Sequence, residues 1–446
     1  MIRTGRALAL LGLALAAIAC PSASNVPPSG SASGAAPTAA VAIPSVASGG
    51  APTAEAAIKE LCVPPRGTAG PPASSGPIPP EIAAIEQQVE EVRGLRYEHP
   101  VAVTPVNAAG MDRQIQKSFD ASYPKTFYDR RTVAWRTIGV IPPDADLRAS
   151  LRSFLTGQVV GFYDPDTGRL VYQRSGDLGI AERFVLAHEL THAIDDQHFD
   201  LSRLDGLARA CEDEASAAAL GAVEGSAQYF ATQVIARNPS TDLGDLVGAI
   251  IQGLGAQQDL AGVPPFVQSL EEWPYTTGLA FITQLAATGG TNAVNHALVD
   301  LPTTTEQVIH ADRYPIDTPT AVEIPDLSAR LGPRWGDLDA MEVGEEWLDA
   351  MLQLRLDGST ASAATAGWDG GVYRAWTDGR DVAVVLRTAW DSERDAAEFL
   401  RASTAWETAG GSISTATRSG STVTLAFASS SGVLDALTSA IAAPSG

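Results

Sequence analysis

Lysine is scarce in this chain, and acidic side chains outnumber basic ones. The sequence has 30 lysines and arginines against 52 aspartates and glutamates, and its formal net charge is -22. Because such a surface repels a phosphate backbone, we expect no nucleic-acid partner. Beyond the first 20 residues the chain also lacks any run of about 18 apolar residues, so we expect no later segment to span a membrane.

The first 20 residues have the pattern of an export signal. Two arginines precede an apolar stretch from residue 7 to residue 19, which is short for a membrane span. The stretch ends in AIAC at residues 17–20, which resembles a bacterial lipobox, although leucine is commoner at its first position. We therefore expect an exported cell-envelope lipoprotein that lipidated Cys20 anchors to a membrane. The alternative is an ordinary A-x-A cleavage before Cys20 and a secreted protein.

Cysteine is also rare, and one of the three cysteines lies in a segment of low complexity. Residues 21–80 are almost entirely alanine, serine, proline, glycine and threonine. Such a segment buries too little apolar surface to offset its chain entropy, so it is predicted to be a disordered tether. Besides Cys20, only Cys62 and Cys211 remain. In an exported chain this favours a Cys62–Cys211 disulfide, with two unpaired thiols as the alternative.

Hydrophobic periodicity predicts an ordered and mainly helical region from residue 81 to residue 356. A β-hairpin is expected within it, because two β-rich runs flank a Pro-Asp-Thr-Gly turn. The expected elements before the central motif are helices at 81–92, 111–122, 127–139 and 144–155, a strand at 101–106, and hairpin strands at 158–163 and 169–173.

The central motif is HELTH, residues 188–192, which lies in a helix predicted from Ile180 to Gln197. His188 and His192 are four residues apart, so both imidazoles project from one face at a spacing that a single metal ion bridges. Glu189 lies beside such an ion, where a carboxylate can take a proton from water that the metal activates. We therefore predict that His188 and His192 bind Zn²⁺ and that Glu189 is a general base.

A third metal ligand is predicted on a second helix, from Glu212 to Arg237. Glu224 in this helix is bracketed by glycines, which disfavour a helix and so require a structural reason. Small residues let a neighbouring helix approach closely, and a carboxylate between them can then reach a metal held by that neighbour. Glu212 and Glu214 are weaker alternatives, because acids at a helix start also interact favourably with the macrodipole. A solvent-exposed glutamate is the other interpretation of Glu224.

These motifs resemble the gluzincin branch of zinc metallopeptidases, in which two histidines and a distal glutamate hold zinc and the motif glutamate is the general base. The chain is also similar, from about Glu81 to Tyr314, to a poorly characterised group of exported bacterial and archaeal metallopeptidases. The stretches that carry this similarity are GFYD (161–164), LAHELTHAIDDQHFDL (186–201), VEG (223–225), PYTTG (274–278) and TTEQVIH (304–310).

The resemblance implies a zincin-like fold for residues 81–356 and hydrolysis of peptide bonds by metal-activated water. It also implies a donor for the developing oxyanion, for which Tyr275 and His310 are candidates, with Tyr314 and His198 as others. The alternative for each of them is a packed aromatic residue or a core histidine. The predicted hairpin can offer an edge strand to an extended peptide or protein substrate.

One position departs from the gluzincin pattern. Many gluzincins carry an aspartate four residues after the third ligand, where it orients a metal-bound histidine, and this chain has Gln228 there. Support for the histidines is then expected from another side chain, and the candidates are Asp195, Asp196 and Asp213.

The pattern of the sequence changes after Ile316. A helix is expected at 345–354, and the Gly/Ser/Ala/Thr-rich residues 357–370 are predicted to be a joint. Residues 370–446 then show strands and helices in the order ββαββα, which predicts a small α+β domain with its helices on one face of an antiparallel sheet. This segment contains no histidine or cysteine, so we assign it no chemistry.

The sequence therefore predicts an α+β protein with a mainly helical metal domain and a small C-terminal domain. Its expected function is an exported zinc metallopeptidase. The alternatives are a non-catalytic cell-envelope lipoprotein whose zincin-like domain holds metal without turnover, and a metal-dependent hydrolase that acts on something other than peptides. Glu189 favours catalysis, because a structural zinc site is closed by a fourth ligand and needs no base.

Overall fold

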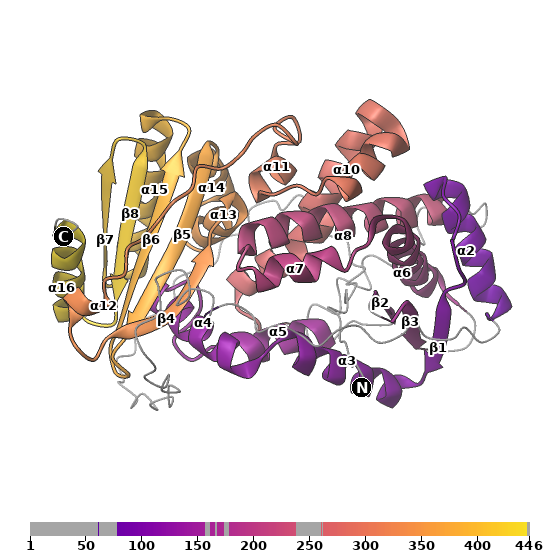
Figure 1. Cartoon of the computed structure of the whole chain (residues 1–446), viewed down its shortest axis with the longest axis horizontal. Helices are drawn as coiled ribbons and strands as arrows, with labels where there is room; N and C mark the ends of the chain where they lie inside the picture. Colours follow the sequence, from indigo (N-terminus) through magenta and orange to yellow (C-terminus); the bar gives the residue numbers. More distant parts are fainter. Residues whose placement is uncertain are drawn as a thin grey trace, which may run out of the picture.

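The computed structural model describes residues 61, 78–156, 161–165, 167–173, 178–237, 260 and 262–443. The predicted export signal (residues 1–20), Cys62 and almost all of the predicted tether lie outside the described residues. The described chain is mixed α+β with two small sheets, which confirms the general fold class expected from the sequence. Figure 1 shows the larger sheet at one end of an elongated molecule and the long helices toward the other.

The first part of the described chain packs helices around a three-stranded sheet of order β1-β3-β2. The β2–β3 hairpin is antiparallel, as predicted, whereas β1 pairs in parallel with β3. That parallel pairing joins segments far apart in the sequence, since Ala102 lies opposite Arg169. The elements are α2 (Pro80–Arg93), β1 (Ala102–Val106), α3 (Ala108–Ser122), α4 (Lys125–Ile138), α5 (Leu147–Thr156), β2 (Gly161–Asp164) and β3 (Arg169–Gln173).

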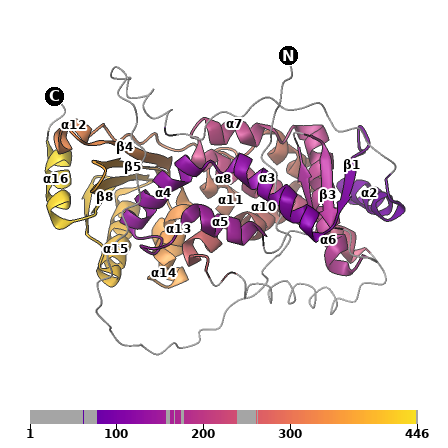
Figure 2. The ribbon, with the colours of Figure 1, turned by 90° about the horizontal axis from the view of Figure 1, so that it is seen from below.

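Two helices of this part are buried on nearly all sides. In α6 (Ile180–Phe199) every residue from Val185 to Asp195 is buried, and in α8 (Asp213–Ala236) so is every residue from Gly221 to Gln228. Helices of this kind must have neighbours on every face. Figure 2 shows α8 and α10 (Pro265–Val299) together in the middle of the molecule. None of the described helices is long and apolar enough to cross a membrane.

Three glycines bring α8 and α10 into backbone contact. A Cβ atom on Gly225 would lie 2.2 Å from the carbonyl oxygen of Gly278, and one on Gly278 would lie 2.1 Å from the carbonyl oxygen of Gly221. A Cβ atom on Gly221 would lie 2.8 Å from the Trp273 ring. A larger residue at any of these positions therefore forces the two helices apart.

The C-terminal part is built on a five-stranded antiparallel sheet of order β4-β5-β6-β8-β7. Short helices, α7 (Arg203–Arg209), α11 (Thr305–Ile309) and α12 (Ser328–Leu331), precede it. Its own elements are β4 (Gly336–Glu342), α13 (Glu345–Gln353), α14 (Gly358–Thr365), β5 (Trp368–Thr377), β6 (Val382–Trp390), α15 (Glu393–Gly410), β7 (Ser414–Ser419), β8 (Thr422–Ala428) and α16 (Ser431–Ala442).

The prediction that helices cover one face of this sheet was wrong. Val384 and Leu386 of β6 pack in one cluster with Phe399 of α15, whereas the intervening Val385 packs in another cluster with Leu437 of α16. Both faces of the sheet are therefore covered, and Figure 1 shows α16 on the opposite side of the sheet from α13 and α14. The continuous apolar run of β6 is typical of a strand that is buried on both faces.

The predicted joint at 357–370 was also wrong in its structure, because residues 358–365 form α14. The side chain of Asp357 accepts a hydrogen bond from the backbone N–H of Thr360, which satisfies a free donor at the start of the helix. Ala361 and Ala364 are buried against neighbouring helices. A capped, alanine-containing segment thus became helical despite its glycine and serine content.

The hydrophobic core does not divide at residues 356–370, where the predicted domains meet. One cluster joins α3, α4 and α5 to the face of the large sheet, and the indole N–H of Trp135 in α4 donates to the hydroxyl of Tyr373 in β5 at 3.2 Å. A second cluster joins α2, α6, α8 and α10. Strand β4 was not predicted. It pairs with β5 in the large sheet, although it precedes the predicted domain boundary at residues 356–370 in the sequence.

Replacing Gly225 with alanine tests the contact between α8 and α10. The added methyl group overlaps the backbone of α10, so Gly225→Ala is expected to lower the free energy of unfolding by about 3 kcal/mol. Gly206→Ala in α7 is the matched control, because its methyl group meets nothing within 4 Å and alanine favours the helix. Urea unfolding of both variants measures the effect, and equal stability of Gly225→Ala and the wild type would contradict the close contact.

Candidate metal centre

The structure brings His188, His192 and Glu224 together, as the sequence predicted. The two histidines lie on α6 and the glutamate on α8, and all three side chains are buried. Among the described residues this is the one group of three or more histidine, cysteine, aspartate or glutamate side chains arranged so that a metal ion can be held.

The three donor atoms form a nearly equilateral triangle. The Nε2 atom of His188 lies 3.0 Å from Glu224 Oε2 and 3.0 Å from His192 Nε2, and the third side, from His192 Nε2 to Glu224 Oε2, is 3.2 Å. Tetrahedral ligands at the usual zinc distances are about 3.3 Å apart, so the triangle fits Zn²⁺. An Nε2 atom carries at most one N–H group, and that group donates to one acceptor. If both histidines donate to Glu224, the contact between their two Nε2 atoms has no hydrogen bond. Hydrogen bonds therefore do not account for all three contacts.

The charges of these groups also suit a cation. Burial raises the pKa of Glu224, but the charge of His192 and the hydrogen bonds from both histidines outweigh it and lower the pKa to about 2. Glu224 is therefore a carboxylate. An ionised carboxylate with two imidazole nitrogens is a donor set that zinc sites commonly use.

The glycines around Glu224 have a different role from the one expected. They were predicted to admit the helix that carries the histidines, but Gly221 and Gly225 face α10, where they contact Trp273 and Gly278. Glu224 points instead toward α6. The two glycines therefore let α10 press against one side of α8, while the carboxylate between them extends from another side.

Glu189 lies next to this triangle, and it is not one of its ligands. It is fully buried, and burial raises its pKa to about 8. Its Oε2 atom accepts a hydrogen bond of 2.7 Å from the backbone N–H of Tyr163, while its Oε1 atom has no partner among the described residues. Tyr163 lies on β2, an edge strand of the small sheet, so the edge of that strand faces Glu189.

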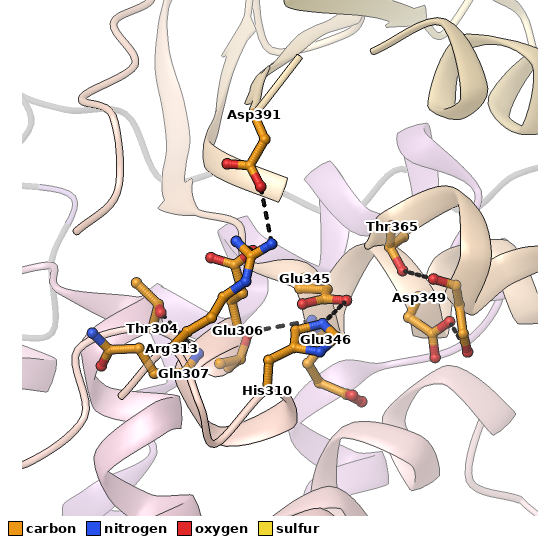
Figure 3. Close-up of polar contacts among 12 residues, drawn as sticks. Thr304, Glu306, Gln307, His310, Arg313, Glu345, Glu346, Asp349, Thr365 and Asp391 are labelled. Carbon is orange, nitrogen blue, oxygen red and sulfur yellow. Dashed lines mark hydrogen bonds and ion pairs between the residues drawn. The ribbon is translucent and has the colours of Figure 1, made fainter. Parts of the chain in front are cut away.

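Of the predicted oxyanion donors, the structure brings Tyr275 to the triangle. Its ring centroid lies 6.2 Å from that of His188, and the side chain is buried. His310 belongs to a different group, in which its Nε2 atom lies 3.1 Å from Glu345 Oε1 of α13, as Figure 3 shows. The hydroxyl of Tyr314 donates to the carbonyl of Asp300, and the Nε2 atom of His198 lies 2.7 Å from the carbonyl oxygen of Arg96.

The two alternative third ligands lie at the start of α8, away from the histidines. Glu212 is the N-cap residue of that helix. The Oε1 atom of Glu214 accepts hydrogen bonds from the backbone N–H and the hydroxyl of Thr305, at 2.5 and 2.7 Å. Glu214 therefore joins α8 to α11.

The three aspartates that were expected to orient the histidines contact other side chains instead. Gln228 is fully buried within reach of His188, but its amide forms no hydrogen bond of good geometry with the described residues. Asp196 accepts a hydrogen bond from the Tyr163 hydroxyl, and Asp213 pairs with Arg131. Asp195 contacts Arg93 and Ser226.

Three residues of the site were not predicted from the sequence: Arg93, Ser226 and Tyr163. Tyr163 and Ser226 lie in or beside stretches that carry the family resemblance, GFYD and VEG, which was a usable signal. Arg93 had no such signal, because an arginine in the last turn of a helix is ordinarily exposed there and interacts with the helix dipole. Here its side chain is fully buried.

Removal of Glu224 tests the metal centre directly. We expect Glu224→Gln to weaken Zn²⁺ binding more than about 100-fold, beyond what loss of an outer-shell partner costs, because the site loses both a ligand and its negative charge. Competition against a chromophoric chelator measures the affinity. Glu212→Gln, at the start of the same helix, is the control, and equal zinc affinity of the two variants would show that Glu224 is not a ligand.

The stability of the α8–α11 contact is expected to fall as the pH rises. Burial raises the pKa of Glu214 to about 7, above its ordinary value of 4.5, although hydrogen bonds from Thr305 lower it. The neutral acid therefore stabilises the fold fully below pH 4.5, and that contribution is lost as the pH rises through about 7. Glu214→Gln removes this titration, so between pH 5 and pH 8 the variant should gain about 2 kcal/mol relative to the wild type.

Urea unfolding across this pH range measures the difference, and the exposed Glu98→Gln is the control. A stability difference between Glu214→Gln and the wild type that stays constant with pH would contradict the raised pKa.

Comparison with known proteins adds one match. Residues 330–438 match the family model of a domain of unknown function, DUF8575. This range covers the five-stranded sheet and most of its helices, and it lies after the residues of the metal centre. No curated protein and no solved structure shows a significant match to the chain.

Proposed function

We propose that this protein is a zinc metallopeptidase of the gluzincin type. His188, His192 and Glu224 are its metal ligands, and Glu189 is its general base. The observation that carries the proposal is a buried triangle of three donor atoms with a further carboxylate, Glu189, next to it on α6. A structural zinc site ordinarily has four protein ligands and no use for such a base.

His188, His192 and Glu224 would hold the zinc ion, which would serve there as a Lewis acid toward water and the scissile carbonyl group. A cation bound in the triangle would favour the ionised form of Glu189 and so oppose the effect of burial on its pKa. The Oε2 atom of this carboxylate is held by the Tyr163 amide, and Oε1 is free to accept a proton from the attacking water. Glu189 then returns the proton to the departing amine. Tyr275, whose ring lies beside His188, is the proposed donor to the developing oxyanion.

The proposed substrate is an extended stretch of a peptide or protein. The edge strand β2 pairs with β3 on one side and faces Glu189 of α6 on the other. A peptide that adds to this edge would place its carbonyl groups next to Glu189, because main-chain hydrogen bonds set the register of an added strand.

We propose that the protein is exported and anchored to a membrane through lipidated Cys20. Cys211 is disulfide-bonded, which supports an oxidising compartment. The proposed partner is Cys62. Its neighbour Leu61 is buried, and the carbonyl oxygen of Leu61 accepts a hydrogen bond from Arg130 of α4. This contact holds the chain next to Cys62 against the folded domain.

Replacing Glu189 tests this function. Glu189→Gln keeps the shape of the side chain and the ligand triangle but removes the base, so cleavage of an unfolded protein should fall about 10²- to 10⁴-fold while zinc content stays the same. Proteolysis assays with zinc content measured by mass spectrometry provide both readouts. Glu182→Gln, earlier on the same helix, is the control.

Retained zinc with equal and negligible cleavage by the wild type and Glu189→Gln would contradict catalysis. It would support a non-catalytic envelope protein that holds the metal.

A further inference from the structure

One buried carboxylate connects the two helices that carry the metal ligands. Asp195 of α6 is fully buried, and its Oδ2 atom accepts a hydrogen bond of 2.8 Å from the hydroxyl of Ser226 on α8. Ser226 is itself fully buried. Ser226 follows the ligand Glu224 by two residues and Asp195 follows the ligand His192 by three, so both residues lie within one helical turn of a ligand.

A buried arginine from a third helix compensates the charge of Asp195. The Nε atom of Arg93, in the last turn of α2, donates to Asp195 Oδ1 at 2.6 Å. Its Nη1 atom donates to Asn295 of α10 at 2.5 Å, and its guanidinium lies over the ring of Phe230 at 4.6 Å. Asp195 is thus the point where α2, α6 and α8 are joined, and Arg93 extends the connection to α10.

Asp195 does not act by orienting an imidazole. The Nδ1 atoms of His188 and His192 are buried and have no hydrogen-bond partner among the described residues. Both oxygens of Asp195 are used by Arg93 and Ser226. Its effect on the metal must therefore pass through the backbone, by fixing the separation of the two helices.

We propose that Asp195 is a positioning residue for the metal centre. Through its hydrogen bond with Ser226 it sets the distance between α6 and α8, and Arg93 compensates its negative charge. This inference rests on the proposed function. The triangle has sides of 3.0 to 3.2 Å, and metal–ligand distances tolerate about 0.2 Å. A small relative shift of α8 therefore moves Glu224 out of coordination range while both helices stay folded.

Ser226→Ala is the sharpest test, because it removes the contact to α8 and leaves the Asp195–Arg93 ion pair intact. We expect the dissociation constant for Zn²⁺ to rise about tenfold, within the range typical of outer-shell partners. Binding of Co²⁺ to the same full-length variant should give a changed visible absorption spectrum, because that spectrum reports the geometry of the ligands. Asp195→Asn is the second variant and should raise the dissociation constant by about 100-fold.

Ser403→Ala is the matched control. Ser403 is also fully buried and helical, but its hydroxyl donates to Leu400 of its own helix, α15. The control also loses a buried hydroxyl, and it is expected to keep the zinc affinity and the Co²⁺ spectrum of the wild type. Urea unfolding of the metal-free proteins measures how much each loss costs the fold.

The outcomes separate this inference from the proposed function. Unchanged zinc affinity in Ser226→Ala and Asp195→Asn, or an equal loss in Ser403→Ala, would overturn the positioning role even if the wild type cleaves protein. A wild type that binds zinc but is no more active than Glu189→Gln would refute the peptidase and leave the positioning role standing. A wild type that binds no zinc would overturn both.

Discussion

The packing of α6 against α8 is the constraint on which the site depends. These helices meet through polar side chains that are fully buried, with His188 and His192 on one helix and Glu224 on the other. Burying such groups is costly unless each has a partner. The ligand triangle and the Asp195–Ser226 hydrogen bond provide these partners, so the helix pair and the proposed metal stabilise one another.

Three further contacts hold α8 in place. On one side, Gly221 and Gly225 let the backbone of α10 contact α8 directly. At its start, Glu214 receives hydrogen bonds from Thr305 of α11, and Asp213 pairs with Arg131 of α4. The ligand helix is therefore held at its start and against α10, and the Asp195–Ser226 hydrogen bond adds the contact to α6; firmly held ligands are what a preorganised metal centre requires.

The C-terminal sheet contributes to the same rigidity. Arg313, which follows α11, pairs with Asp391 at the end of β6 at 2.9 Å, and His310 contacts Glu345 of α13 (Figure 3). Thr305 of α11 donates a hydrogen bond to Glu214, so these contacts join the region around α11 to the part of the chain that matches the domain of unknown function. His310, first considered as a catalytic donor, is one of the residues that connect the two parts.

The sequence alone determined the features that depend on local spacing. The four-residue interval of His188 and His192 places both rings on one helix face wherever that helix lies, and periodicity located most helices within a few residues. Only the tertiary structure decided which of several acids reaches the histidines, that Tyr275 lies beside them, and that helices cover both faces of the large sheet. These outcomes depend on contacts between distant segments, and local spacing carries no information about how two helices cross or which face of a strand another helix covers.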